Sequence, residues 1–169
     1  MTSSRDYPLV ATGGALAIEA YLYGLSKARL LFGPMMFVDA FPGIYGLLIA
    51  GAMAAGIVLS AVMLRRWIVA ADSWAILRLS LIGTYLTAML AGALWAVADL
   101  LLIPVYSLEW PGMVVLVERP IGNAAVALMF VTIEILWVLP AAVCLTFALR
   151  AVGRARYEPG DRLVTTSES

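Results

Sequence analysis

Two glutamates, Glu19 and Glu134, lie deep inside long apolar stretches of the sequence. Glu134 is the one charged residue between Ile121 and Leu149. A charged side chain at the centre of a membrane costs about 2.5–3.5 kcal/mol on insertion scales, unless it is protonated, paired or facing water. Acids in such positions mark ion pathways, proton relays or ligand sites. We therefore treat both glutamates as candidate functional residues.

The two acids are predicted to lie at a similar depth. At 1.5 Å per residue, Glu19 is roughly 17 Å into its predicted helix and Glu134 roughly 20 Å into its own. The two helices approach the centre of the membrane from opposite directions. If the helices are neighbours, the carboxylates could share a proton in a relay or bind a cation. Alternatively, each is a protonated acid that hydrogen-bonds a tyrosine or threonine and helps to fix the bundle.

Further polar residues complete the candidates for an ion, proton or ligand pathway. Tyr23 could hydrogen-bond a buried acid. Asp39, in the first predicted outer loop, and Asp99, near the outer end of the third predicted helix, would form an ionic layer with Lys27 and Arg29. That layer is either a set of exposed salt bridges, each worth little, or the mouth of a pathway that leads to the two acids.

The residue types that are missing exclude much cofactor chemistry. The chain has no histidine and a single cysteine, Cys144, so we expect no haem, copper, iron–sulfur or metal site. Cys144 lies in an apolar stretch, where we expect a buried, inert thiol. A quinone or a lipid could still bind, and Trp137, one turn from Glu134, could stack on a quinone headgroup. The alternative for Trp137 is a core or lipid-facing position.

Composition predicts an integral membrane protein. The chain has 169 residues, 63% of them hydrophobic, with a mean hydropathy of +0.97, whereas soluble domains are about 45–50% apolar. A spanning helix needs about 20 mainly apolar residues. Four segments qualify, at residues 8–31, 42–64, 74–102 and 120–149. We predict an all-α fold, a four-helix transmembrane bundle that forms a single domain over residues 1–156, with a polar tail over 157–169.

The basic residues predict the orientation of this bundle. One side of the predicted topology holds all but three of the eleven basic residues, and the three are Lys27, Arg29 and Arg119. Because cytoplasmic loops carry an excess of lysine and arginine, we expect both termini in the cytoplasm. The expected location is a multi-pass position in a prokaryotic cell membrane.

Small residues recur every four positions in two of the predicted helices. They are Ala52, Gly56 and Ser60 in the second, and Ala88, Gly92 and Ala96 in the third. Such stripes let helix backbones approach closely, either within the bundle or against another subunit. The five apolar residues Met113–Val117 fall in a predicted outer loop, where they could dip into the interface or dock on another protein.

Three function classes fit these features. The first is a non-catalytic integral membrane subunit of a larger energy-converting or transport complex, which the scarcity of catalytic side chains favours. The second is a small proton- or cation-coupled transporter or channel that uses the intramembrane carboxylates. The third is a quinone- or lipid-handling enzyme. Expected partners are membrane lipids and other membrane subunits or further copies of this chain. Nucleic acid is not expected, because no dense basic cluster is present.

Overall fold

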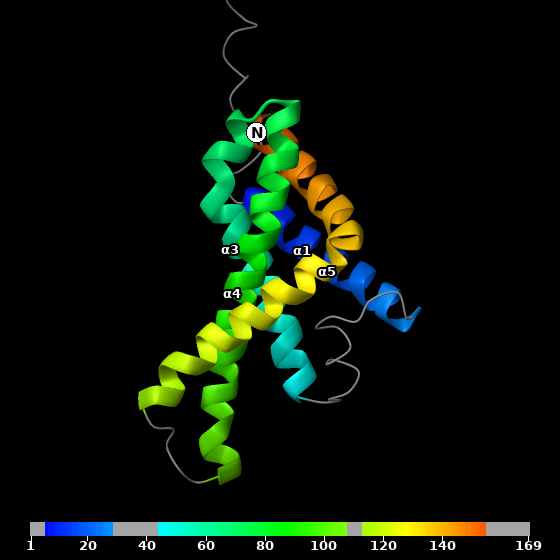
Figure 1. Cartoon of the computed structure of the whole chain (residues 1–169). Helices are drawn as coiled ribbons and strands as arrows, with labels where there is room; N and C mark the ends of the chain where they lie inside the picture. Colours follow the sequence, from blue (N-terminus) through cyan, green and yellow to red (C-terminus); the bar gives the residue numbers. More distant parts are fainter. Residues whose placement is uncertain (1–5, 29–43, 108–112, 155–169) are drawn as a thin grey trace, which may run out of the picture.

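The computed structural model describes residues 6–28, 44–107 and 113–154, which form a bundle of four helices (Figure 1). The helices are α1 (Asp6–Lys27), α3 (Ile44–Ala70), α4 (Ser73–Ser107) and α5 (Met113–Arg154). Each contains a segment long and apolar enough to cross a membrane. The prediction of four such helices in an all-α fold is therefore confirmed.

Each helix packs against at least two others, and α3 also contacts α5. Only Ala71 and Asp72 separate α3 from α4, so these two helices run antiparallel and pack along each other. The other main partner of α4 is α5, while α1 lies against α3 and α5 (Figure 1). The helices that carry the two acids, α1 and α5, are thus in contact.

At one end of the bundle, α1 and α5 make polar contacts to α3 and to Ala71, which follows it, and we call this the closed end. The Tyr7 hydroxyl of α1 donates to the carbonyl oxygen of Ala61 at 3.0 Å. The Arg154 guanidinium of α5 donates to the carbonyls of Val69 at 3.1 Å and Ala71 at 2.9 Å. Arginine thereby satisfies carbonyls that the end of a helix leaves without partners. These contacts bring the start of α1 and the end of α5 to the same end of the bundle.

All four helices depart from the predicted bounds, and α1 begins at Asp6 instead of residue 8. The helix α3 continues past Arg65 and Arg66, because arginine is a good helix former and its charge interrupts only the apolar run. The helix α4 continues past Pro104 to Ser107. The helix α5 begins at Met113 and contains Pro120, so residues 113–117 are helical and not a loop. Three predicted features lie outside the described residues: the end of the first helix at 31, the start of the second helix at 42 and the polar tail at 157–169.

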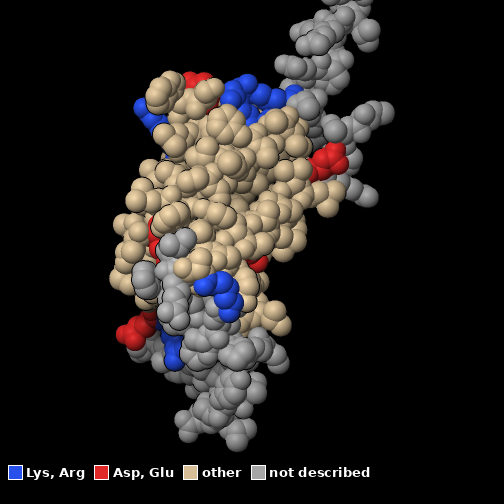
Figure 2. All heavy atoms as spheres, turned by 90° about the vertical axis from the view of Figure 1, so that its right-hand side faces the viewer, with Lys and Arg blue, Asp and Glu red and all other residues tan. Residues whose placement is uncertain are grey.

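The surface of the bundle is largely apolar. Leu47 is 74% exposed and Leu136 is 81% exposed. Figure 2 shows a group of basic side chains at the upper end of the molecule and others lower down, with a mostly uncharged surface between them. The described arginines near this end are Arg65, Arg66, Arg78, Arg150 and Arg154. Cys144 is exposed, so the prediction of a buried thiol is wrong: its position on α5 points outward.

Small residues line the helix contacts. All six members of the two stripes, Ala52, Gly56, Ser60, Ala88, Gly92 and Ala96, are buried. A Cβ atom on Gly56 would lie 3.0 Å from the Thr87 carbonyl oxygen of α4. One on Gly92 would lie 2.7 Å from Cα of Ala124 in α5. The stripes therefore let α4 approach both of its neighbours within the chain.

Candidate functional site

A cavity of about 120 Å³ lies among the four helices. Its lining is mainly aliphatic, and on α5 it extends from Ala127 to Leu149, roughly 33 Å of helix at 1.5 Å per residue. Six polar side chains contribute to it: Ser60, Ser80, Thr84, Thr87, Glu134 and Thr146. The cavity is thus elongated and combines one acid with five hydroxyl groups.

Among the described residues that line the cavity, Glu134 is the one ionisable side chain. It is only 6% exposed, although Leu136, two positions later, is 81% exposed. The helical rotation of α5 therefore turns the carboxyl group inward. Pro140 lies inside α5 and cannot donate to the carbonyl of Leu136. The helix changes direction between its yellow and orange parts (Figure 1), as expected near an internal proline.

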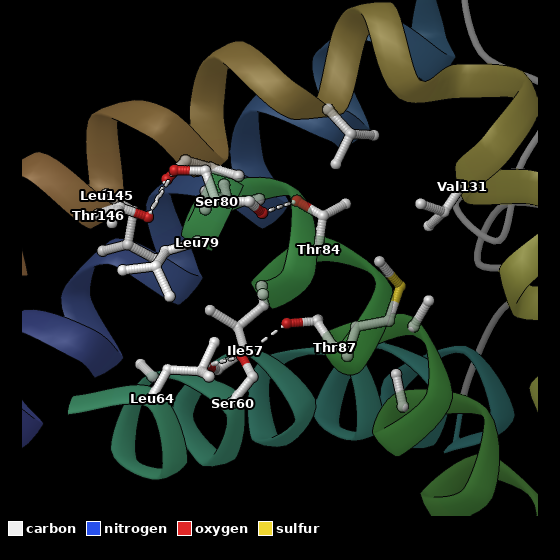
Figure 3. A pocket seen from close by; sticks show the side chains of 18 of the residues that line it. Ile57, Ser60, Leu64, Leu79, Ser80, Thr84, Thr87, Val131, Leu145 and Thr146 are labelled. Atoms are coloured by element: carbon white, nitrogen blue, oxygen red, sulfur yellow. Dashed lines mark hydrogen bonds between the residues drawn. The ribbon is translucent and has the colours of Figure 1, made fainter. Parts of the chain in front are cut away.

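The first hydroxyl pair joins α3 to α4. The Ser60 and Thr87 hydroxyl oxygens lie 2.7 Å apart. Ser60 also lies 2.9 Å from the carbonyl oxygen of Ile57, to which it donates. Both protons are satisfied when Thr87 donates to Ser60 and Ser60 donates to its own helix (Figure 3).

The second hydroxyl pair joins α4 to α5. Ser80 lies 3.0 Å from the Thr146 hydroxyl and 2.8 Å from the carbonyl oxygen of Ile76. Thr146 donates to the carbonyl oxygen of Ala142 at 2.8 Å, and Thr84 donates to the backbone carbonyl oxygen of Ser80 at 2.8 Å. Figure 3 shows both pairs beside the apolar side chains of the cavity. Because a hydroxyl has one proton and two lone pairs, these groups retain acceptor capacity toward the cavity.

Glu19 has a different environment. Its Oε1 atom is buried and has no hydrogen-bond partner, and its carboxyl group lies beside the backbone of Ala54 in α3. The cavity is lined by Ile18 and Leu22 from α1, but not by Glu19. The helices of the two acids do touch, yet only Glu134 reaches the cavity.

Two other candidate residues lie on the outside of the bundle. Trp137 is 42% exposed, and its carbonyl accepts a hydrogen bond from the Tyr21 hydroxyl at 3.2 Å. Tyr23 is also 42% exposed, and the Lys27 Nζ atom lies 5.2 Å from the centre of its ring. Neither residue lines the cavity. Asp39 and the side chain of Asp99 lie outside the described part of the structure.

The sequence interpretation overlooked the hydroxyls of Ser80 and Thr146 as cavity groups. Ser80, Thr84 and Thr87 recur at the spacing of one helix face, which is a signal that the sequence does contain. The partner of Ser80 is on another helix, so its pairing could not be read from one segment. In the described ranges, no three histidine, cysteine, aspartate or glutamate residues gather as a metal site.

Comparison with protein-family models, curated proteins and solved structures finds no match to this chain. The chemistry of the cavity therefore has to be inferred from its own geometry. The arrangement can accept hydrogen bonds and balance one positive charge in an otherwise apolar space.

Proposed function

We propose that this chain is an integral membrane protein that moves protons or a small cation across the membrane through the cavity. Glu134 would bind the positive charge. The observation that carries the proposal is a buried carboxyl group in an elongated cavity. The cavity lining on α5 spans roughly 33 Å of helix, which is similar to the hydrocarbon thickness of about 30 Å.

The hydroxyl pairs support this function by providing further oxygen atoms along the route. Ser60–Thr87 and Ser80–Thr146 lie at different heights on α4, roughly 10 Å apart at 1.5 Å per residue. Their lone pairs can accept hydrogen bonds from water molecules or from a cation in transit. In this proposal Glu134 alternates between a charged and a neutralised state, and the closed end faces the cytoplasm because it is rich in arginine.

The test is proton flux in liposomes that contain the purified chain and a pH-sensitive dye. A potassium gradient with valinomycin sets the membrane potential that drives protons inward. We expect flux above that of protein-free liposomes, and at least a tenfold lower rate for Glu134→Gln. The matched control is Glu118→Gln, because Glu118 is an exposed acid on the same helix and its substitution should leave the rate unchanged.

Two results would contradict this proposal. One is a wild-type rate no higher than that of empty liposomes. The other is a Glu134→Gln rate equal to the wild type, which would give the carboxyl group a structural role only. Size-exclusion chromatography of each variant separates a loss of transport from a loss of folding.

A second candidate is the non-catalytic subunit of a larger membrane complex. The helices α4 and α5 have 35 and 42 residues, roughly 52 and 63 Å at 1.5 Å per residue, and so exceed the membrane thickness unless they tilt. The parts of α4 and α5 that exceed the membrane thickness would then contact another subunit. Gentle detergent extraction tests this: co-purifying membrane proteins favour the subunit, and a lone homo-oligomer favours the transporter.

A quinone- or lipid-handling enzyme is the third class. Trp137 would be the stacking residue for a quinone, but it lies outside the cavity. Its placement therefore adds no support to that class.

A further inference from the structure

We propose that the cavity binds a small organic ammonium ion, with its charged head at Glu134 and its apolar body along the aliphatic wall. This inference rests on the proposed transport function, because it names the class of cation that occupies the same cavity. Three properties of the cavity support it: the direction of its hydrogen bonds, the separation of its oxygen atoms and the balance of apolar and polar lining.

The hydrogen bonds of the cavity lining favour a ligand that donates hydrogen bonds. Ser60, Thr84 and Thr146 each donate to a backbone carbonyl of their own helix. Ser80 donates either to the carbonyl oxygen of Ile76 or to the Thr146 hydroxyl, and Thr87 can donate to Ser60. With these protons engaged, the hydroxyls present mainly lone pairs to the cavity. Together with the carboxyl group of Glu134, they favour a ligand with N–H donors and disfavour an anion.

The separation of the oxygen atoms disfavours a bare inorganic cation. Calcium takes six to eight oxygen ligands and magnesium takes six in near-ideal geometry. Here the two hydroxyl pairs are centred on Thr87 and Ser80, two helical turns apart and roughly 10 Å from each other along α4. One ion cannot contact both pairs at once. An ammonium head needs only a few acceptors near one charge, and Glu134 and the hydroxyl groups of the cavity lining are such groups.

The aliphatic lining favours an organic body. Ile57, Leu64, Leu79 and Leu145 surround the space between the hydroxyl pairs, as Figure 3 shows. An engineered apolar cavity of about 150 Å³ binds benzene, so a cavity of about 120 Å³ has room for one small ring or a short alkyl chain. A hydrophobic wall with a few polar groups that fix orientation is typical of small-molecule sites.

The experiment compares three probes of nearly equal shape: benzylammonium, benzyl alcohol and benzoate. Each is titrated at neutral pH against the purified full chain in detergent, and the unfolding midpoint is followed, because a ligand of the folded state raises stability with concentration. We expect an apparent Kd for benzylammonium at least tenfold below that for benzyl alcohol. Benzoate should produce no stabilisation.

Variants assign this preference to Glu134. Glu134→Gln should weaken benzylammonium to the affinity of benzyl alcohol and leave benzyl alcohol itself unchanged, while Glu118→Gln should behave as the wild type. If Glu134→Gln does not fold, Glu134→Asp is the alternative, because it keeps the charge but shortens its reach. Its affinity for benzylammonium should lie between the wild-type affinities for benzylammonium and for benzyl alcohol. Equal affinities for ammonium and alcohol in the wild type, or a preference for benzoate, would overturn the inference.

The two proposals can fail separately. Proton flux in liposomes is measured without any amine, whereas probe binding is measured without a membrane. Proton flux that depends on Glu134, without a binding preference for benzylammonium, would contradict the organic ammonium ligand and support the transport function. Preferential binding of benzylammonium without proton flux would contradict the transport function and support a binding site for organic ammonium ions.

Discussion

At the closed end of the bundle, Tyr7 and Arg154 direct their polar atoms to backbone carbonyls of a neighbouring helix. In the cavity, Thr84 and Thr146 donate to carbonyls of their own helices. The first arrangement ties α1, α3 and α5 together. The second satisfies the hydroxyl protons locally and leaves oxygen lone pairs at the cavity that Glu134 also lines.

This difference separates two uses of polar side chains inside an apolar bundle. Interhelical hydrogen bonds are one means by which apolar helices associate, and the closed end uses them in that way. Among the described residues, two hydroxyl pairs in the cavity connect neighbouring helices, Ser60–Thr87 and Ser80–Thr146. Substitutions at the closed end should therefore lower stability without changing transport. Substitutions at Glu134 should lower transport without lowering stability.

The largest expected difference is between Glu134 and Glu19, an acid that belongs to neither region. Glu19→Gln should keep the flux within about twofold of the wild type, whereas Glu134→Gln should lower it at least tenfold. Replacing this half-buried carboxyl group, whose Oε1 atom lacks a hydrogen-bond partner, with an uncharged amide should also raise the unfolding midpoint. The measurement is liposome flux together with thermal unfolding of both variants.

An equal loss of flux in the two glutamine variants would contradict this separation. Glu19 would then act in the same route as Glu134, as the sequence alone suggested. The isosteric substitution is a suitable probe because it changes the charge of the side chain and preserves its size.

Arg154 tests the closed end itself. Arg154→Met keeps much of the aliphatic stem and removes both donors to the end of α3. Hydrogen bonds of charged groups contribute about 1.5–3 kcal/mol each, but one of these bonds is exposed, so we expect a total loss of about 1–2 kcal/mol in unfolding free energy. Unfolding by SDS in mixed micelles measures the loss, and the flux should not change.

The control for this substitution is Arg66→Met, because Arg66 is exposed near the end of α3. It removes the same charge from the same end of the bundle. If both variants lose equal stability, the net charge of the closed end matters and the two hydrogen bonds do not.

The number and approximate position of the helices could be predicted from the sequence, because apolar length is a local property. The ends of α3 and α5 could not, since the end of an apolar run is not the end of a helix. Arg65, Arg66 and Pro120 interrupt or flank the apolar runs, yet the helices continue through them. Hydropathy predicts where lipid could surround a helix and says less about where its hydrogen bonds stop.

The candidate site was predictable only in part for a related reason. Glu134 was evident because one charge in a long apolar run is conspicuous. Whether it faces Glu19, a hydroxyl pair or another chain depends on the rotation and crossing of α1, α4 and α5, which are tertiary properties. Trp137 illustrates the limit: it is one turn from Glu134 along the helix, yet it lies outside the cavity.

Tyr7 gives the smallest expected effect and the most specific test of the closed end. Tyr7→Phe removes the hydrogen bond to Ala61 and keeps the ring, over which the Arg65 guanidinium lies 4.9 Å from the centre. A single neutral hydrogen bond contributes about 1 kcal/mol, so the unfolding free energy should fall by about that amount in SDS titration, with unchanged flux. Tyr21→Phe removes a more exposed bond and should cost less. A loss of flux in Tyr7→Phe would mean that the closed end takes part in transport, and the separation of the two regions would have to be abandoned.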